Sequence, residues 1–383
     1  MIVVCSCQNE SNSYYSEQNA KVFEDSLSME EVGTISFPLD SVTGFYHNSI
    51  QAFSQADSSY LSFFNEEVNA LYIYNYETGN LVKRISYAIE GPDGLGNKYN
   101  IGHCIINLDS VLICTPQSFN LFLTNGKGRV LKRYKIREKK SDIDLAYPDP
   151  CAVKPIIVKD AKAYITGLML GIENVIDQTK VFNVAEVDLV SGNVRPLVTR
   201  PDIYARGQWG MISKYHVYPC YNPLSGRFIY SFGLIHEVLE TDHLGFVEWR
   251  YNGSKYFSHI KPFSKDAITK ETYPGKDPLQ KYDHTTPSYY YITFDPYRKL
   301  YYRFATLPLS VDEYNATDRQ HQPSIIILNE KFEKTGETVM PKTGFNYRMI
   351  FLNKEGLHIG KESEYRKDES KLSFGIFLPQ PKL

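Results

Sequence analysis

The chain has 383 residues, and its 42 basic and 44 acidic side chains give a formal net charge of −2. Because these charges nearly cancel, no global positive field would attract nucleic acid or an anionic membrane, so a charged ligand must be met by a local patch. Aromatic residues account for 14% of the chain, and they fit the half-buried faces of β-sheets. The composition therefore favours an all-β protein with ample core.

The first segment, residues 1–30, is expected to be a signal remnant and flexible tether outside the single folded domain of residues 31–383. Its start, MIVVCSC, resembles the end of a bacterial lipoprotein signal, in which a small residue precedes the cysteine that is lipidated, here Cys7. The preceding apolar stretch is too short for a complete signal peptide. We expect an exported protein that meets the membrane only through an acyl anchor on Cys7; an ordinary tail with two chance cysteines is the alternative.

One local pattern recurs five times along the folded domain: an apolar run, a turn rich in Asn, Gly, Lys or Thr, and a second β-rich run. Each copy is expected to form a β-hairpin, because Gly and Asn reach the positive φ angles of tight turns and the flanks are β-branched or aromatic. The copies lie at residues 71–86, 121–136, 183–198, 245–260 and 324–340. Such spaced hairpins indicate a β-propeller, in which small sheets surround an axis.

The pattern predicts an all-β propeller of six four-stranded blades. Five blades are expected at residues 45–87, 99–136, 152–199, 213–262 and 288–340. The remainder, residues 345–378, supplies only three strands, and the lone β-rich segment 32–38 is expected to join it and close the ring through main-chain hydrogen bonds. Seven blades would result if residues 263–289 held further strands, although their composition is typical of a loop. No amphipathic helix longer than a couple of turns is expected.

Several of these features together resemble a known family of unknown function. The irregular long repeats, the abundant Tyr and Asn and the linker EGPDGLG at residues 90–96 are similar to the uncharacterised six-bladed propeller lipoproteins of gut Bacteroides and their relatives. The resemblance covers most of the chain and rests on overall pattern. It implies a place in the cell envelope, in the periplasm or at the outer-membrane surface, and it implies no particular activity.

Four cysteines lie within the predicted domain. Cys104, Cys114, Cys151 and Cys220 are even in number, and an exported protein could pair them. Cys104 and Cys114 lie on two runs that are expected to form a hairpin. Buried free thiols are nevertheless favoured, because free cysteine behaves as a small core residue.

Neither a metal nor a cofactor is expected. No CxxC pair or His–Cys cluster predicts zinc. Three long loops are rich in carboxylates that could hold calcium, but they lack the alternating Asp spacing of a calcium loop, so ordinary solvated acidic loops are favoured. These loops contain Glu173, Asp177, Glu237, Glu240, Asp242, Asp312, Glu313 and Asp318.

Ligands usually dock where blade-joining loops meet the axis of a propeller, and by fold analogy we place the candidate site there. The loop after the third blade holds Arg200, Arg206 and Trp209 and leads to Tyr215 and His216. Arginine offers a planar donor fork for a carboxylate or phosphate, and aromatic rings offer flat faces for a sugar. The loop therefore predicts a site for an acidic glycan or a peptide; a core Trp209 with solvated arginines is the alternative.

The predicted inner strands add residues that could line the channel, namely His47, His103, His216 and Arg348. Imidazoles that converge on the axis could bind a metal or an anion. Histidines that are satisfied by backbone or water are the more common case, and they remain the alternative here.

His284 is a further candidate ligand residue, at the entry to the fifth blade. Its neighbour Asp283 is not expected to orient it, because adjacent residues on an extended chain point to opposite sides. The same objection applies to Asp242 and His243. No nucleophile elbow, Walker loop, dinucleotide fingerprint or HExxH motif is present, so no catalytic residue can be named.

These observations favour a tethered binding module that engages a glycan, a peptide or an envelope protein through its loop-rich face. The alternative is an exported polysaccharide-active lyase or hydrolase whose site is assembled from several blades at the channel mouth. It predicts a perturbed acid or base within reach of an arginine. A purely structural role in an envelope assembly would instead predict an exposed apolar patch.

Overall fold

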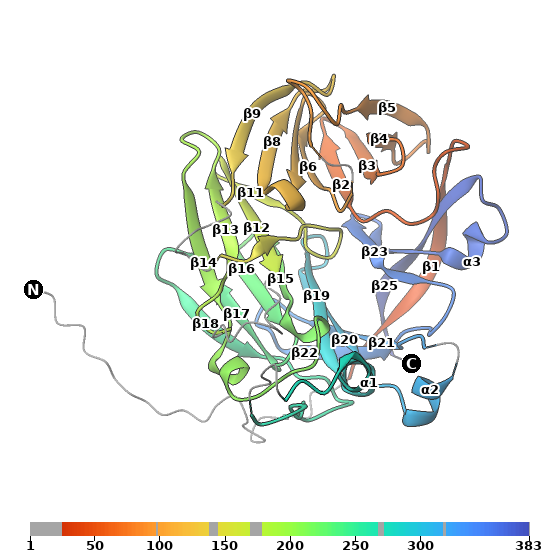
Figure 1. The fold of residues 1–383 in the computed structure, drawn as a ribbon. Helices are drawn as coiled ribbons and strands as arrows, with labels where there is room; N and C mark the ends of the chain where they lie inside the picture. The colour runs from red at the N-terminus through yellow and green to blue at the C-terminus, as the bar shows by residue number, and fades with distance from the viewer. Residues whose placement is uncertain are drawn as a thin grey trace, which may run out of the picture.

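The computed structural model describes residues 25–96, 99–137, 145–168, 178–266, 272–316 and 319–382. Within these ranges the protein is all-β, and small sheets are arranged around a common centre like the blades of a propeller (Figure 1). Cys7 and residues 1–24 of the predicted tether lie outside the described residues, as do Glu173, Asp177 and Asp318 of the acidic loops.

Four of the sheets follow the order of the sequence. Three are four-stranded and antiparallel, and the fourth carries an additional short strand, β10. Their strands are β2 (Ile50–Gln55), β3 (Ser58–Asn65), β4 (Ala70–Asn75) and β5 (Leu81–Ser86); β6 (Gly102–Asn107), β7 (Ser110–Thr115), β8 (Asn120–Thr124) and β9 (Val130–Lys135); β10 (Tyr147–Pro148), β11 (Ile157–Lys159), β12 (Lys162–Leu168), β13 (Phe182–Asp188) and β14 (Val194–Thr199); and β15 (Val217–Asn222), β16 (Arg227–Phe232), β17 (Glu237–Thr241) and β18 (Val247–Tyr251).

The fifth sheet has eight strands and contains both ends of the folded chain. Its order is β19-β20-β21-β22-β1-β25-β24-β23. The bounds are β19 (Ser288–Asp295), β20 (Leu300–Thr306), β21 (Pro323–Leu328), β22 (Lys334–Val339), β1 (Leu27–Pro38), β25 (Lys371–Pro381), β24 (Gly356–Gly360) and β23 (Asn346–Asn353). Between β22 and β1 the register has a single parallel pair, Leu27 with Gly336, so the sheet is almost divided into two halves of four strands.

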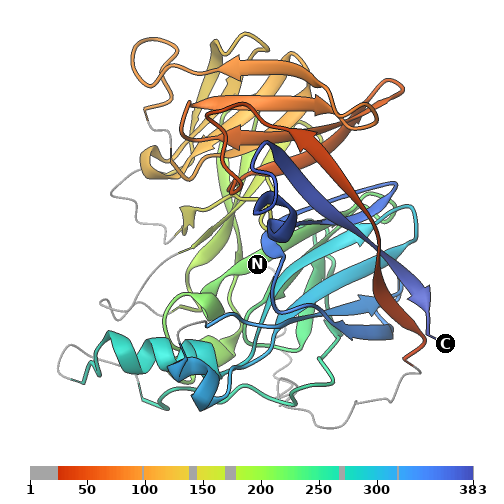
Figure 2. The same cartoon turned by 90° about the vertical axis from the view of Figure 1, so that its right-hand side faces the viewer.

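The N-terminal strand closes the ring as the sequence predicts. β1 pairs antiparallel with β25 from Leu27 opposite Pro381 to Pro38 opposite Lys371, and Figure 2 shows the red and dark blue strands side by side. The strand begins at Leu27 rather than at residue 32, because a bulge after Glu31 lets pairing continue past the break in the alternating pattern. It therefore starts before the predicted domain boundary at residue 31.

Four of the five predicted hairpins are confirmed, as β4–β5, β8–β9, β13–β14 and β21–β22. The hairpin predicted at residues 245–260 is wrong, because the turn lies earlier, between β17 and β18. The Asp242 carboxylate accepts hydrogen bonds from the backbone N–H groups of Leu244, Gly245 and Phe246, which fixes that turn. After β18 the chain is held by the neighbouring sheet, since Ser254 donates to Glu337 over 2.6 Å.

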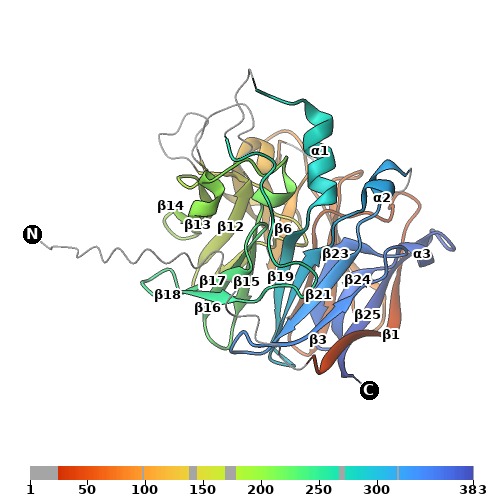
Figure 3. The ribbon, with the colours of Figure 1, turned by 90° about the horizontal axis from the view of Figure 1, so that it is seen from below.

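The helices are short and few within the described residues. They are α1 (Lys276–Thr285), α2 (Val311–Asn315) and α3 (Glu362–Tyr365), with 3₁₀ turns at Pro116–Ser118, Asp202–Ala205 and Ser213–Tyr215. The expectation that residues 263–289 form a loop is wrong for α1, whose Leu279 and Tyr282 are buried. Its Asp-Pro start is typical of a loop, but proline is also compatible with the first turn of a helix. Figure 3 shows α1 beside α2.

The centre of the ring is filled by the chain itself. The connection between β10 and β11 reaches inward (Figure 1), and we call its residues 149–154 the axial plug. Val153 packs into the core cluster that contains Tyr218 and Ile350, and Ala152 packs into a second cluster with Ile50 and Met349. The plug thus joins the inner faces of several sheets.

Candidate functional site

The axial plug is held in place by backbone hydrogen bonds. The N–H and C=O groups of Cys151 and Lys154 bond each other over 3.1 and 3.0 Å, which makes a tight turn. The N–H of Ala152 donates to the carbonyl of Asn48 over 2.9 Å, and the N–H of Asp149 donates to Thr166 over 3.0 Å. The plug is therefore anchored to the first and third sheets, and its side chains have fixed positions at the axis.

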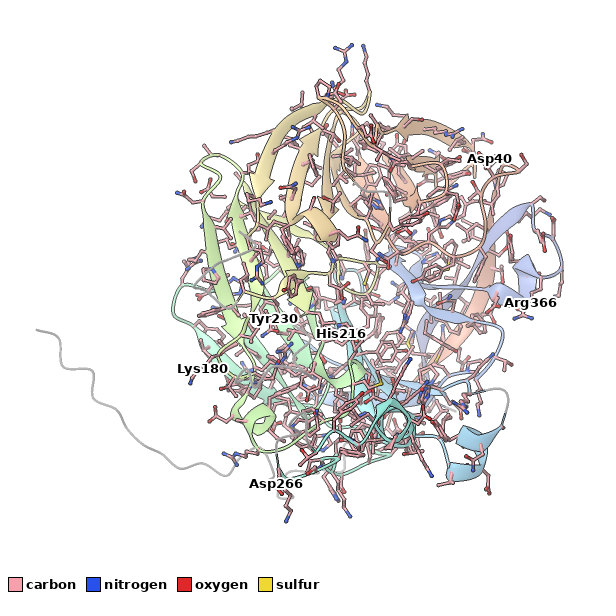
Figure 4. All side chains as sticks on the ribbon, viewed as in Figure 1. Asp40, Lys180, His216, Tyr230, Asp266 and Arg366 are labelled. Carbon is pink, nitrogen blue, oxygen red and sulfur yellow. The ribbon has the colours of Figure 1, made fainter. Side chains whose placement is uncertain are left out.

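Lys154, Asp149 and His216 form a polar cluster where the plug meets the fourth sheet. The Lys154 side chain is only 4% exposed, and its ammonium group donates to the Asp149 carboxylate. The same Nζ lies 3.1 Å from Nδ1 of His216, and His216 precedes β15. Figure 4 labels His216 near the middle of the ring.

His216 sits in a positive electrostatic environment. Burial lowers its pKa well below the usual value, and the charges of Lys154, Arg348 and Arg200 lower it further. The imidazole is therefore neutral at pH 7. Since Arg348 lies on β23 and Arg200 follows β14, residues far apart in the sequence act on this one ring.

Tyrosines and a thiol complete the surroundings of His216. Tyr218 of β15 lies 5.7 Å from the His216 ring and 6.4 Å from the ring of Tyr290, measured between centroids. Burial raises the pKa of the Tyr46 hydroxyl although the nearby Arg348 guanidinium lowers it, and burial likewise raises the pKa of the Cys151 thiol. These groups therefore stay protonated at neutral pH.

We call this set the axial cluster. Its members come from the plug, from the segments before β2 and β15, and from the inner strands β15, β19 and β23. Most of them are partly exposed, whereas Lys154 and Tyr218 are buried beneath. The cluster consists of Tyr46, Asp149, Cys151, Lys154, His216, Tyr218, Tyr290 and Arg348.

The predicted loop after β14 is only partly available to a ligand. Trp209 is fully buried within a core cluster, which matches the alternative of a core residue, and Arg206 is exposed. Arg200 is buried, and its guanidinium donates twice to the carbonyl of Tyr215, over 3.0 and 2.8 Å. The Tyr215 hydroxyl donates to Gln208 over 2.6 Å. Arg200 thus acts on the axial cluster through its charge.

The three inner-strand imidazoles do not converge, and His103 matches the alternative of a satisfied histidine. His103 of β6 is buried between the hydroxyls of Ser49 and Ser62, at 2.7 and 2.8 Å, and burial lowers its pKa to about 3. His47 lies before β2 and stacks on Phe63 with 4.0 Å between ring centroids. Only His216 belongs to the axial cluster, because the first two rings lie within the core of the first sheets.

His284 lies on α1 and belongs to a different group. Its Nδ1 is 2.8 Å from Nε2 of His321, and the two rings stack in parallel. Asp283 accepts from the backbone N–H of Met211 over 3.1 Å and does not orient the imidazole. The expectation that these neighbours do not act as a pair therefore stands, although the backbone there is helical rather than extended.

The sequence pattern missed most members of the axial cluster. The predicted blade ranges put the stretch DPCAVK at residues 149–154 partly between the second and third blades and partly at the start of the third. The available signal is that small and apolar residues follow a charged loop here. A solvated loop does not require such residues, so they indicate a buried segment. Tyr46, Tyr218 and Tyr290 carry no signal that separates them from other tyrosines.

Within the described residues, no group of three or more His, Cys, Asp or Glu side chains could hold a metal ion. None of the helices in the described ranges has the length and apolar character needed to span a bilayer. The four described cysteines are free; Cys104 and Cys114 lie on paired strands but diagonally, opposite Leu112 and Gly102.

Comparison with known proteins gives a family and a fold. No curated protein matches the chain. A crystal structure of a DUF4221 family member from Bacteroides vulgatus superposes with a TM-score of 0.77 at 23% identity, covering 94% of this chain and 100% of that one. A putative exported protein from Bacteroides fragilis gives a TM-score of 0.53 at 10% identity, with 96% and 98% covered.

The family model described as Domain of unknown function (DUF4221) matches residues 24–339. This range includes β1, the axial plug and every sheet strand up to β22. The resemblance to an uncharacterised propeller family of Bacteroides is thereby confirmed, and the chain belongs to the DUF4221 family.

Proposed function

We propose that this protein is an exported binding module, tethered through a lipid on Cys7, that takes a glycan, a peptide or a partner protein at its axial cluster. The observation that carries the proposal is the convergence of polar, partly exposed side chains from the plug and from three inner strands. Convergent polar groups on a rigid scaffold are typical of ligand sites. The description of the Bacteroides fragilis neighbour as exported supports the localisation.

We also propose that the eight-stranded sheet functions as two blades, which gives six in all. One half is β19 to β22 and the other is β23, β24, β25 and β1. The single parallel pair between β22 and β1 supports this division, since a continuous sheet would pair along more of its strand length. The two halves then present separate inner strands, β19 and β23, to the axis.

An exported lyase or hydrolase remains the second candidate, because one observation favours it. His216 is a perturbed imidazole near Arg348, which is the arrangement that the enzyme alternative predicts. The hydrogen bond from Lys154 to Nδ1 weakens this candidate, since it occupies the nitrogen that would otherwise be free to take a proton. Binding is therefore the function that the geometry supports best.

The test is a binding screen on glycan and peptide arrays with two matched variants. Tyr46 is 52% exposed and belongs to the cluster, whereas Tyr297, 58% exposed, lies in the turn after β19. We expect Tyr46→Ala to lose most of the signal of any bound ligand and Tyr297→Ala to keep it. Absence of binding to every array member, or equal signals for the two variants, would refute the proposal. Turnover of an array sugar would instead favour the enzyme.

A further inference from the structure

The contact between Lys154 and His216 determines where the imidazole carries its proton. A lysine ammonium has three N–H donors and no acceptor, so the nitrogen that faces it must accept. That nitrogen is Nδ1, 3.1 Å from Lys154 Nζ. Asp149 Oδ2 is 3.7 Å from the same atom, too far for a hydrogen bond. Because His216 is neutral at pH 7, its single proton lies on Nε2, and the ring presents a donor away from Lys154.

The charges in the cluster do not cancel. Asp149 neutralises Lys154, but Arg348 forms no ion pair with any carboxylate in the part of the chain that the structure describes. Arg200, behind His216, bonds only neutral oxygens of Tyr215 and Gln178. Near His216 the field is therefore positive, as the depressed pKa of the imidazole also indicates.

The exposed groups of the cluster are mostly donors. Arg348 hydrogen-bonds the Tyr46 hydroxyl and offers its remaining guanidinium N–H groups. His216 offers Nε2–H, and Tyr46 and Tyr290 offer protonated hydroxyls. Donors in a positive field bind a carboxylate or phosphate more strongly than a neutral ligand, because charge-assisted hydrogen bonds are the stronger ones. Tyrosine faces beside the donors suit the C–H face of a sugar ring, and no aliphatic side chain of the cluster is present to anchor a peptide.

We propose that the axial cluster binds the carboxylate of an acidic sugar, such as a uronic acid unit in an oligosaccharide, with Arg348 and the Nε2–H of His216 as its donors. This inference rests on the proposed binding function and specifies its ligand class. Tyr46 and Tyr290 flank the sugar ring, and Lys154 acts as a positioning residue that fixes the tautomer of His216. Asp149 accepts a hydrogen bond from Lys154 and holds its side chain in place.

The experiment compares charged and neutral forms of one sugar by isothermal titration calorimetry. The probes are trigalacturonate and its fully methyl-esterified form, which has the same rings without the negative charges. We expect the ester to bind at least tenfold more weakly to the wild-type protein. Arg348→Gln should weaken trigalacturonate binding by about tenfold or more, and the difference between the two sugars should largely disappear in that variant.

The matched control is Arg366→Gln, which removes the same charge at a distant position. Arg366 follows α3, its side chain is 72% exposed and it bonds Glu362; Figure 4 places it at the rim, far from His216. We expect this variant to bind like the wild type. A pentaglutamate peptide is the third probe, and it should bind more weakly than trigalacturonate.

Several outcomes would overturn the inference. Equal affinity for the acid and its ester, equal losses in the two arginine variants, preference for pentaglutamate, or no binding of trigalacturonate would each do so. If a neutral array ligand depends on Tyr46 while trigalacturonate does not bind, the proposed binding function stands and only the ligand class is wrong. The role of Lys154 is tested separately by NMR. Lys154→Met removes the donor that faces Nδ1, so the proton of His216 is no longer fixed on Nε2 and the ¹⁵N chemical shifts of the ring should change.

Discussion

Replacing Gly102 with alanine should test whether the scaffold positions the plug. Gly102 opens the inner strand β6, and a Cβ there would lie 2.4 Å from Cγ and 2.6 Å from Cβ of Pro150. Its φ lies outside the left-handed region, so an alanine backbone is unstrained and the effect comes from the clash alone. Pro150 is a ring within the plug, between Asp149 and Cys151, and it cannot rotate away.

The expected cost follows from this overpacking. A group forced into a well-packed core destabilises a protein by about 1–3 kcal/mol, and the clash with a ring and a backbone oxygen at 3.0 Å puts Gly102→Ala in that range. Gly33→Ala is the control, because Gly33 also lies in a strand and its Cβ would meet only Ile376 Cδ1, at 3.9 Å. Removing a glycine there should leave stability unchanged or raise it by about 0.5–1 kcal/mol.

Urea unfolding followed by tryptophan fluorescence measures both variants. The free energy of unfolding should fall for Gly102→Ala and not for Gly33→Ala, with similar slopes against urea. The clash in Gly102→Ala should also displace the plug and so shift Lys154 relative to His216. The NMR signals of His216 should therefore change in Gly102→Ala and not in Gly33→Ala. Equal stability of the two variants would refute the claim that close packing on β6 holds the plug in place.

Three further predictions concern the scaffold. Burial lowers the pKa of His103 to about 3 from an unfolded value of 6.5, so the neutral form stabilises the fold above pH 6.5 and the unfolded chain takes up the proton first as the pH falls. His103 should therefore lower the free energy of unfolding by about 2 kcal/mol between pH 7 and pH 5. Urea unfolding of His103→Gln at the two pH values should show a decrease that is smaller by this amount. Arg303→Met should cost at least about 3 kcal/mol by calorimetry, because it leaves the buried Ile235 carbonyl and the buried side-chain oxygen of Asn252 without this donor, whereas an unchanged melting temperature would contradict this. Phe37→Ala on the fully buried face of β1 should cost about 3–5 kcal/mol in the same assay, and a smaller loss would mean that ring closure contributes little.

The fold was largely predictable because its signals are local. Aromatic and β-branched residues around turns rich in Gly and Asn predict hairpins such as β4–β5, and the unpaired run at residues 32–38 predicts β1. The errors arise where a distant contact decides the local structure. Asn252 and Gly253 form a turn-like pair, yet Ser254 is bound by Glu337, and this pulls the chain out of the hairpin that its composition favours.

The candidate site was much less predictable. His216 and Arg348 were expected near the axis because any propeller brings its inner strands there, but Trp209 and His103 satisfy the same pattern and are buried. Lys154 and Asp149 were missed altogether, since their contacts depend on how residues 149–154 fold into the ring. The position of a plug is set by side chains of several sheets at once, and no short stretch of sequence contains that information.

Two arginines show which physical criterion separates scaffold from site. Arg303 is fully buried, donates to neutral oxygens and to Asn252, and stacks over Tyr289 at 3.7 Å. Its hydrogen-bonding capacity is used inside the protein, so a ligand could gain nothing from it. Arg348 is exposed, has no carboxylate partner in the described ranges, and its charge lowers the pKa of the His216 imidazole. A residue type alone cannot distinguish these cases, whereas the partners of its donors can: the donors of Arg303 are used inside the protein, and Arg348 has no carboxylate partner among the described residues.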